Sequence, residues 1–345
     1  MRLLLTLAAL AALSMTLTGT RRNPAFPPVE SVEAVGGLPA HIAGRFQDIT
    51  ACQQTAEGEY FVFDRRAHAV FAVSRPYDAA REIIRIGAEP GRLLRPTAFD
   101  LADDGRLVVA DAPGNQGRIQ LFLTTGASLG GFRLATRDVP TLVFENFLQS
   151  GIGSLSFTGR SIVISQPELG TLVSEYSLDG HVSRTFGTLR RTGQEQDREV
   201  HVALNTGLPI VNPQGGFYFV FLGGVPMFRK YDDSGTLLFE RHIEGPEIDP
   251  HVRALPTVWP RRQTDAGELP IVQPGIRTAA ADAGGNLWIS LAAPFTYVYD
   301  STGDKRRTIQ FRAAGLISPR SLFFTAGGRL LVTPGCYAFP AESRL

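Results

Sequence analysis

Six short apolar segments along this chain each run into a tight turn that contains a glycine, and a second short apolar segment follows each turn. The turn glycines are Gly58, Gly105, Gly159, Gly215, Gly285 and Gly328. The intervals between successive glycines are uneven, the shortest from Gly285 to Gly328 and the longest from Gly215 to Gly285. Periods of this size are typical of architectures in which each repeat is one small structural unit. The repeated strand, turn and strand therefore constrain the fold more than any other feature.

A second set of turn glycines follows the first, at Gly126, Gly180, Gly235 and Gly303. Each lies at nearly the same distance after the first turn glycine of its own unit. Only fixed strand lengths keep two turns in step over several units, so the double periodicity predicts four short antiparallel strands in each unit. In the clearest unit we expect these strands at 97–102, 106–110, 118–123 and 128–134.

The second strand of each unit is rich in β-branched and aromatic residues, at 60–63, 107–109, 162–164, 217–221, 287–289 and 330–332. These segments are too short for helices and too apolar for an exposed face. Six sheets packed radially cover both faces of every sheet, so we predict an all-β fold, a six-bladed β-propeller of four-stranded antiparallel blades. The last unit ends one strand short. We expect the N-terminal segment 30–36 to complete it and close the ring.

The segment 1–20 reads as a secretory signal peptide. Met1 and Arg2 precede an apolar run that ends near Leu17, and small residues suited to peptidase cleavage follow. The alternative is an uncleaved anchor, but the run is on the short side of the roughly 20 residues that span a bilayer. We favour cleavage, which predicts a secreted or periplasmic protein without stable membrane insertion. Segment 21–28 then forms an extended leader, and segment 29–345 forms one propeller domain.

Composition narrows the class of partner. The chain has 34 basic and 33 acidic residues, a formal net charge of +1, and is 43% hydrophobic. It therefore lacks the bulk positive charge that attracts nucleic acid, and we expect no nucleic-acid partner. Its two cysteines, Cys52 and Cys336, belong to the first and last units, which ring closure brings side by side. They form either one disulfide or two buried free thiols, and the sequence leaves both readings open.

The second unit resembles an NHL repeat in the order of its residues, at Pro96, Asp104 to Gly105, 108–111, Asn115 and 118–122. The likeness is weaker in the first unit and reduced to strands and turns elsewhere, and segment 111–118 is about two residues longer than usual. The resemblance implies a six-bladed propeller in a family that contains binding modules and a few metal-dependent enzymes. The C-terminal third is also similar to exported bacterial propellers of unassigned role.

Function is expected on the face opposite the glycine turns, where the loops between second and third strands meet the connectors between blades. The long connectors 189–206 and 244–274 lie there. Counting back eight to ten positions from each turn glycine gives the residues expected to ring the channel mouth, which are Asp48, Arg95, Gln149, Asn205, Arg277 and Arg320, with Thr50 and Thr97 just inside. Three converging arginines favour a carboxylate, phosphate or sugar acid. Alternatively, they pair with carbonyls and acids of adjacent blades.

Other chemical signals are weak. His251 and Trp259 lie in the longer connector, where Trp259 is either a binding anchor or a residue that pins the connector to the rim. The six histidines show no metal-ligand spacing, so we expect neither a metal site nor a cofactor. Asp64 and Asp111 end equivalent strands and are expected to accept hydrogen bonds from the backbone amides of the following loop. The sequence contains no signal for a catalytic nucleophile.

These observations favour an exported, non-enzymatic propeller that binds a protein, peptide or carbohydrate through its loop face. The runner-up is a hydrolase or lyase, metal-assisted or not, that acts on a small anionic substrate at the channel mouth. A third reading is a structural ring within an envelope complex. The sequence therefore predicts the fold and leaves the ligand, and the question of catalysis, open.

Overall fold

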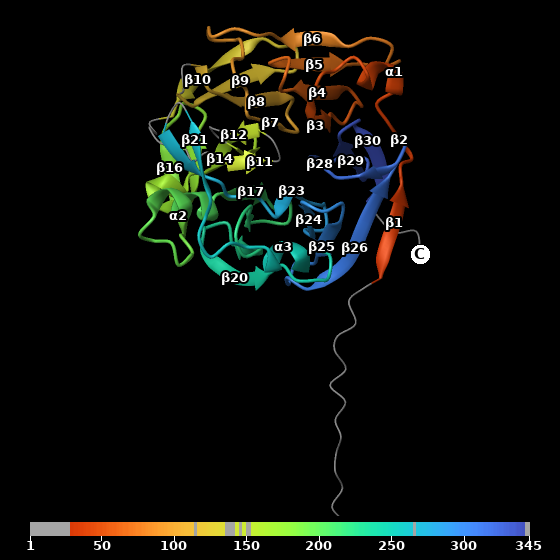
Figure 1. Ribbon diagram of the computed structural model, residues 1–345. Coiled ribbons are helices and arrows are strands. Elements are labelled where there is room, and N and C mark those ends of the chain that lie inside the picture. Colours follow the sequence, from red (N-terminus) through yellow and green to blue (C-terminus); the bar gives the residue numbers. More distant parts are fainter. Residues whose placement is uncertain are drawn as a thin grey trace, which may run out of the picture.

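The computed structural model describes residues 28–113, 116–134, 153–264 and 267–341, together with the backbone of 142–144 and 147–149. The predicted signal peptide, the leader up to Pro27, and Asn115 lie outside the described residues. Within the described part, six four-stranded sheets surround a central channel (Figure 1). The predicted six-bladed β-propeller is confirmed.

Each blade runs from an inner strand at the channel to an outer strand at the rim. The first three blades comprise β3 (Ile49–Gln54), β4 (Tyr60–Asp64), β5 (Ala69–Val73) and β6 (Arg81–Ile84); β7 (Ala98–Leu101), β8 (Arg106–Asp111), β9 (Arg118–Leu123) and β10 (Ser128–Arg133); and β13 (Leu155–Phe157), β14 (Ser161–Ser165), β15 (Thr171–Ser177) and β16 (Val182–Thr188). The last three comprise β17 (Gly207–Val211), β18 (Phe217–Phe221), β19 (Met227–Tyr231) and β20 (Leu237–His242); β23 (Ile276–Ala281), β24 (Leu287–Leu291), β25 (Thr296–Tyr299) and β26 (Lys305–Arg312); and β28 (Ser321–Phe324), β29 (Arg329–Thr333), β30 (Tyr337–Pro340) and β2 (Gly36–Gly37).

The N-terminal segment closes the ring, as predicted, but it is divided between two blades. Strand β1 (Val29–Glu33) pairs in parallel with β26, the outer strand of the fifth blade. Strand β2 then pairs antiparallel with β30 and completes the sixth blade. The change of partner occurs at Ala34 and Val35, whose amides donate to the carbonyls of Arg312 and Ala338 at 2.9 and 2.8 Å. One short segment therefore links the last two blades to the start of the first.

A disulfide joins Cys52 of β3 to Cys336, the residue before β30. The two Cα atoms are 5.7 Å apart, and both side chains are buried. This settles the alternative that the sequence left open, in favour of the disulfide. The bond connects the first and last blades at the point where the ring closes.

The second strands are buried along most of their length, because each is covered by the blades on both sides. All five residues of β4, β18 and β24 are buried. Aromatic side chains make many of the contacts between blades: Phe63 stacks on Phe99 with ring centroids 5.7 Å apart, and Phe228 lies 4.9 Å from Tyr299. The β-branched and aromatic composition of these strands is thus explained by burial on both faces.

The second set of turn glycines has a packing role as well as a conformational one. Gly126 has a φ of +90°, and a Cβ there would overlap the carbonyl oxygen of Ile83, in the outer strand of the preceding blade. Gly180, Gly235 and Gly303 meet the preceding blade's outer strand in the same way, at Phe132, Phe186 and Phe239. The repeat of these glycines therefore reflects close approach between successive blades.

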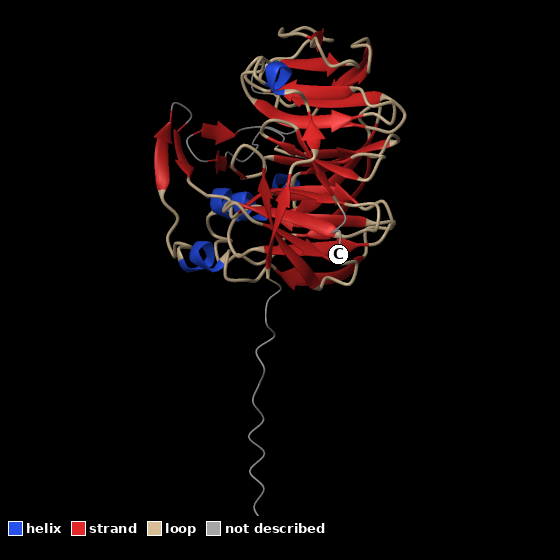
Figure 2. Cartoon of the chain, turned by 90° about the vertical axis from the view of Figure 1, so that its right-hand side faces the viewer, coloured by secondary structure: helices blue, strands red, loops and turns tan. Residues whose placement is uncertain are grey.

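One face of the propeller carries most of the additional structure. The added elements are helices α1 (Ala40–Ala43), α2 (Arg198–Asn205) and α3 (Asp249–Arg253), the 3₁₀ turn η2 (Pro167–Leu169), the hairpins β11 (Leu142–Phe144) to β12 (Phe147–Gln149) and β21 (Arg261–Thr264) to β22 (Gly267–Pro270), and strand β27 (Leu316–Ile317), which pairs with β26. Figure 2 shows the helices and the protruding hairpin towards one side of the disc. We call this side the connector face. None of the described helices is long and apolar enough to span a membrane.

The connectors contain helices and hairpins that the sequence analysis did not predict. Asp197 caps α2 by accepting a hydrogen bond from the amide of Val200 at 3.3 Å, and the helix buries Val200, Ala203 and Leu204 against the fourth and fifth blades. A helix this short gives too little periodicity to be recognised alone, because its stability comes from tertiary packing.

Candidate functional site

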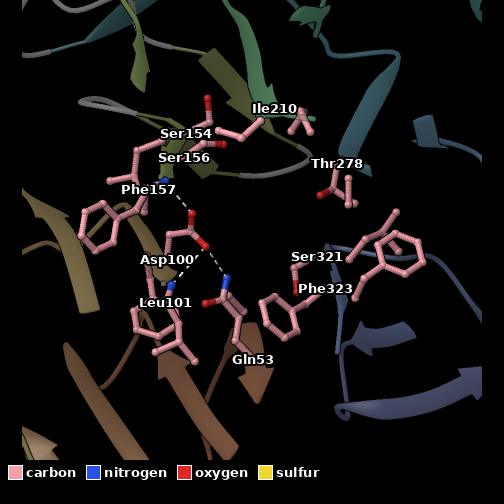
Figure 3. A pocket seen from close by; sticks show the side chains of 18 of the residues that line it. Gln53, Asp100, Leu101, Ser154, Ser156, Phe157, Ile210, Thr278, Ser321 and Phe323 are labelled. Carbon is pink, nitrogen blue, oxygen red and sulfur yellow. Dashed lines mark hydrogen bonds between the residues drawn. The ribbon is translucent and has the colours of Figure 1, made fainter. Parts of the chain in front are cut away.

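The inner strands of all six blades enclose a channel with a volume of about 600 Å³. Arg277 and Arg320 line its connector end, and residues of the glycine turns, such as Asp103, line the opposite end. Between them the wall carries hydroxyl groups, from Thr50, Thr97, Ser154, Ser156, Thr278 and Ser321. Phenylalanine and aliphatic side chains also line it, together with Gln53 and Asp100 (Figure 3). The channel can therefore offer both hydrogen bonds and apolar contact to a ligand.

Asp100, on β7, is a carboxylate of the channel wall that accepts three hydrogen bonds. Its Oδ1 accepts hydrogen bonds from Gln53 Nε2 at 2.9 Å and from the amide of Leu101 at 3.1 Å. Its Oδ2 accepts from the amide of Phe157 at 2.7 Å (Figure 3). Gln53 belongs to the first blade and Phe157 to the third, so one carboxylate connects the inner strands of three consecutive blades.

Burial raises the pKa of Asp100 to about 6, although the hydrogen bonds from Phe157, Gln53 and Leu101 act in the opposite direction. Desolvation disfavours the charged form of an acid more than these three bonds favour it. A carboxyl group with a pKa near 6 can both hold and release a proton close to neutral pH. Asp100 is therefore a candidate for binding or for proton transfer within the channel.

At the connector end, Arg320 is held by an acid of the neighbouring blade. Its Nη1 donates to Asp48 Oδ1 at 2.9 Å, and the other oxygen of Asp48 accepts from Arg65 Nη2 at 3.1 Å. The Arg320 side chain nevertheless remains 39% exposed. Arg277 donates from Nε to the carbonyl of Ala292 at 3.1 Å. Both arginines thus line the channel, with the contacts to carbonyls and acids that the alternative interpretation anticipated.

The other residues predicted at the mouth take different positions. Asn205 ends α2 and is fully buried, where its side chain accepts from the amide of Arg190 at 2.8 Å and donates to the carbonyl of His201 at 2.9 Å. Arg95 is exposed in the connector before β7, and Gln149 ends β12, where only the backbone is described. Asn205 and Arg95 are not among the described residues that line the channel.

His251 and Trp259 both belong to the long connector between the fourth and fifth blades. The Trp259 ring is half-buried and packs against the core of these two blades. Burial lowers the pKa of His251, and its Nε2 is a buried atom without a hydrogen-bond partner. These contacts agree with the interpretation that Trp259 holds the connector against the rim.

Asp64 accepts a hydrogen bond from the loop that follows it, as expected, whereas the described amide that donates to Asp111 lies in the connector before its blade. Asp64 accepts hydrogen bonds from the amides of Gln47 at 2.7 Å and Ala67 at 3.0 Å. Asp111 accepts from the amide of Leu94 at 3.0 Å and forms a buried ion pair with Arg118, at 2.6 Å. Both carboxylates are therefore occupied in holding loops between strands.

A second carboxyl group with a raised pKa lies outside the channel lining, on η2. Burial raises the pKa of Glu168 to about 7, and its Oε2 is buried without a hydrogen-bond partner. The Tyr176 hydroxyl, close enough to Glu168 for its own pKa to be raised further, donates to Gln166 Oε1 at 2.6 Å. No group of three or more His, Cys, Asp or Glu side chains among the described residues could hold a metal ion.

The sequence analysis missed the residues deepest in the channel, notably Asp100, Ser154 and Ser156. It searched eight to ten positions before each turn glycine, which corresponds to the connector end. Asp100 lies only five positions before Gly105. An acidic residue in an inner strand is unusual enough in a buried segment to have served as a signal.

No protein-family model matches the sequence, and no curated protein sequence matches it, so the resemblance to NHL repeats is not confirmed. Among solved structures, the chain is similar to virginiamycin B lyase from Staphylococcus aureus, with a TM-score of 0.51, 10% identity, and coverage of 83% of this chain and 80% of that one. The chain is also similar to a catalytically inactive variant of that lyase with quinupristin, with a TM-score of 0.50, 9% identity, and coverage of 85% of this chain and 84% of that one. For regucalcin, a calcium-binding protein from Agrobacterium tumefaciens, the TM-score is 0.49 and the identity 14%, with coverage of 89% of this chain and 88% of that one. At such identities the two lyase structures indicate a shared fold alone.

Proposed function

We propose that this protein is an exported binding module that takes a carboxylate-bearing carbohydrate or peptide into its central channel from the connector face. One observation carries the proposal: Arg277 and Arg320 both line the connector end of a channel of about 600 Å³. A guanidinium group offers five N–H donors in a planar arrangement that matches a carboxylate. The ligand's acidic group would therefore bind at this end.

The channel wall below the arginines supports a ligand that is polar along its length. Hydroxyl groups from five of the six inner-strand regions line it, between phenylalanine side chains. Carbohydrates and peptides both use this combination of hydrogen bonds and apolar contact. The net charge of +1 supports local recognition by the two arginines over attraction by the whole molecule.

Export is a part of the proposal, supported by the signal-like segment 1–20 and by the disulfide. Disulfides persist in oxidising compartments and are rare in the cytosol. Cell fractionation of a producing bacterium tests this directly, combined with thiol labelling of the fractions. We expect the protein outside the cytoplasm, without reactive thiols; a cytoplasmic, fully labelled protein would contradict export.

We also propose that the second blade is an NHL-type repeat, supported by its Asp111 to Arg118 ion pair.

Binding is tested on the full chain by isothermal titration calorimetry with two pairs of probes. Trigalacturonate is compared with neutral galactotriose, and N-acetyl-trialanine with its C-terminal amide. We expect at least one acidic probe to bind about tenfold or more tightly than its neutral counterpart, because a hydrogen bond to a charged group contributes about 1.5–3 kcal/mol. Equal binding within both pairs, or binding of neither acid, would contradict the proposal.

The variant Arg320→Ala should weaken the acidic probe about tenfold. Its fold should be preserved, because Asp48 keeps its ion pair with Arg65 at 3.1 Å. The matched control is Arg306→Ala, which removes an arginine that is 61% exposed and pairs with Asp300 on the opposite face. We expect this control to bind like the wild type. Equal losses in the two variants would indicate a general effect of charge.

A second candidate is a hydrolase or lyase that acts on the same kind of acidic substrate, favoured by the pKa of about 6 of Asp100. A group with this pKa suits general acid or base catalysis near neutral pH. Incubation with trigalacturonate distinguishes the two: a lyase produces the ultraviolet absorbance of a new double bond, and a hydrolase produces new reducing ends. Turnover that Asp100→Asn abolishes would establish the enzyme, and unchanged trigalacturonate favours the binding module.

A further inference from the structure

We propose that Asp100 forms a second subsite within the channel, which binds a primary ammonium group. The inference rests on the proposed function for the ligand's acidic end, and it identifies the ligand as a zwitterion about as long as a tripeptide. The acidic end lies at Arg277 and Arg320, and the ammonium group lies deeper, beside Asp100.

The Asp100 carboxylate has room for one more donor. A carboxylate accepts hydrogen bonds at about four positions on its two oxygens. Three are used, by Gln53 Nε2 and by the amides of Leu101 and Phe157. Asp100 also lines the channel, and Figure 3 shows its side chain among the lining residues. A ligand group that donates a hydrogen bond can therefore occupy the remaining position.

The carboxylate lacks a positive partner within the described part of the chain. No ion pair joins it to any described lysine, arginine or histidine, and the nearby charge that acts on it, Asp103, has the same sign. A partly buried carboxylate without a counter-charge carries a desolvation cost. An ammonium group from a ligand would supply the missing charge.

Two hydroxyl groups of the channel wall also favour a hydrogen-bond donor. Ser154 Oγ donates to the carbonyl of Gly207 at 2.9 Å, and Ser156 Oγ donates to the carbonyl of Pro209 at 2.6 Å. Each hydroxyl has one proton, so both oxygens can act towards the channel only as acceptors. Both serines line the same channel as Asp100, and Figure 3 labels all three. An ammonium group has three donors and no acceptor, and it matches a wall of acceptors.

Gln53 supplies an independent sign that this region is polar and incompletely paired. The side chain is only 8% exposed, and its Oε1 is a buried atom without a hydrogen-bond partner. Such atoms are uncommon in folded proteins, and each calls for a partner such as a water molecule or ligand. Because Gln53 Nε2 donates to Asp100, the two side chains form one polar group in the channel wall.

The two subsites are separated by the length of a short peptide. Arg277 and Arg320 each lie eight positions before their turn glycine, and Asp100 lies five positions before Gly105. All inner strands run from the connector face to the glycine turns, so the difference of three positions places the Cα atoms of the arginines and of Asp100 about 10 Å apart along the channel. An extended peptide spans about 3.3–3.6 Å per residue, so about three residues reach from one subsite to the other. A single amino acid is too short.

Calorimetric titration of the full chain with trialanine, N-acetyl-trialanine and alanine tests the inference. We expect trialanine to bind about tenfold or more tightly than either comparison ligand, because acetylation removes the ammonium group and alanine cannot reach both ends. Asp100→Asn should reduce trialanine affinity to that of N-acetyl-trialanine and leave the acetylated peptide unaffected. The matched control, Asp78→Asn, alters an exposed carboxylate between β5 and β6, outside the channel lining, and should bind trialanine like the wild type.

A further measurement uses only the wild-type protein and so does not depend on the folding of a variant. An ammonium group beside Asp100 favours its charged form, so trialanine binding at a pH near 6 should release protons. Titration in two buffers with different heats of ionisation detects this release, and N-acetyl-trialanine should not cause it. Equal affinity for the two peptides, no effect of Asp100→Asn, or no proton release would overturn the ammonium subsite.

The same titrations separate this inference from the proposed function. If Arg320→Ala weakens N-acetyl-trialanine while acetylation and Asp100→Asn have no effect, the acidic end is supported and the ammonium subsite is wrong. If trialanine depends on Asp100 but not on Arg320, the ammonium subsite stands and the position of the acidic end is wrong. If trialanine does not bind the wild type, the inference fails, and the trigalacturonate titration decides the proposed function.

Discussion

Cys52 and Cys336 are bonded to each other across a sequence separation of 284, and their disulfide joins the first blade to the last. The same seam is held by β2, which pairs with β30, and by β1, which pairs with β26. The chain between β2 and β3 links the two blades only while β2 stays paired with β30. The disulfide therefore keeps the ring closed when the hydrogen bonds of the N-terminal segment open.

We expect the loss of this disulfide to lower the free energy of unfolding by about 2–5 kcal/mol, because it removes a restraint on a very long loop of the unfolded chain. Urea unfolding with and without a reductant measures the effect. The double variant Cys52→Ser, Cys336→Ser is the control and should not respond to the reductant. A wild-type protein of equal stability in both conditions would contradict the prediction.

Asp100 should make stability fall as the pH rises. Its pKa is about 6 in the folded protein, against a usual value of 3.8, so the folded state holds the proton more tightly than the unfolded state. The stabilisation of the folded state by this proton is complete below pH 3.8 and is lost as the pH rises through 6. Relative to Asp100→Asn, the wild-type free energy of unfolding should fall by up to about 3 kcal/mol over this range. Urea unfolding at a series of pH values measures it, and parallel profiles would show that Asp100 does not titrate there.

Glu168 should produce a similar change at higher pH. Its pKa of about 7 lies above the usual 4.5, because burial disfavours the charge and Oε2 has no hydrogen-bond partner. Stability from its protonation is present below pH 4.5 and is lost as the pH rises through 7. We therefore expect Glu168→Gln to be more stable than the wild type above neutral pH, by up to about 3 kcal/mol, and similar to it near pH 4.5.

The control for Glu168→Gln is Glu82→Gln, which alters an exposed side chain on β6. It should leave the free energy of unfolding unchanged at either pH, because its side chain is solvated in both states. A Glu168→Gln variant that is less stable than the wild type above neutral pH would show that the carboxylate has a favourable partner there.

The strands could be predicted from the sequence because the two sets of turn glycines limit their lengths. The third strand of the second blade, expected at 118–123, is β9 (Arg118–Leu123). The division of the N-terminal segment could not be predicted, since it depends on which edges remain unpaired after the blades have formed. Helix α2 was missed because its stability depends on burying Val200 and Leu204 against other blades.

The candidate site was predicted less completely than the fold. Counting from the glycines assumed that every inner strand extends to the mouth, and this holds for Arg277 and Arg320. It does not hold for Asn205, because α2 replaces the start of the strand and turns that side chain towards Arg190. The role of Asp100 depends on contacts with Gln53 and Phe157, which lie on other blades and leave no mark in local sequence.

The two sets of turn glycines should differ in their tolerance of alanine. Gly105 and Gly126 both have positive φ angles, of +77° and +90°, so alanine at either position should cost about 1–2 kcal/mol from backbone strain. A Cβ at Gly105 would lie 3.9 Å from its nearest neighbour, Thr124, whereas one at Gly126 would overlap the carbonyl of Ile83 in the preceding blade. We therefore expect Gly126→Ala to cost about 1–3 kcal/mol more than Gly105→Ala, because β6 must move away. Urea unfolding of the two variants measures the difference, and equal losses would show that conformational strain alone explains the second set of glycines.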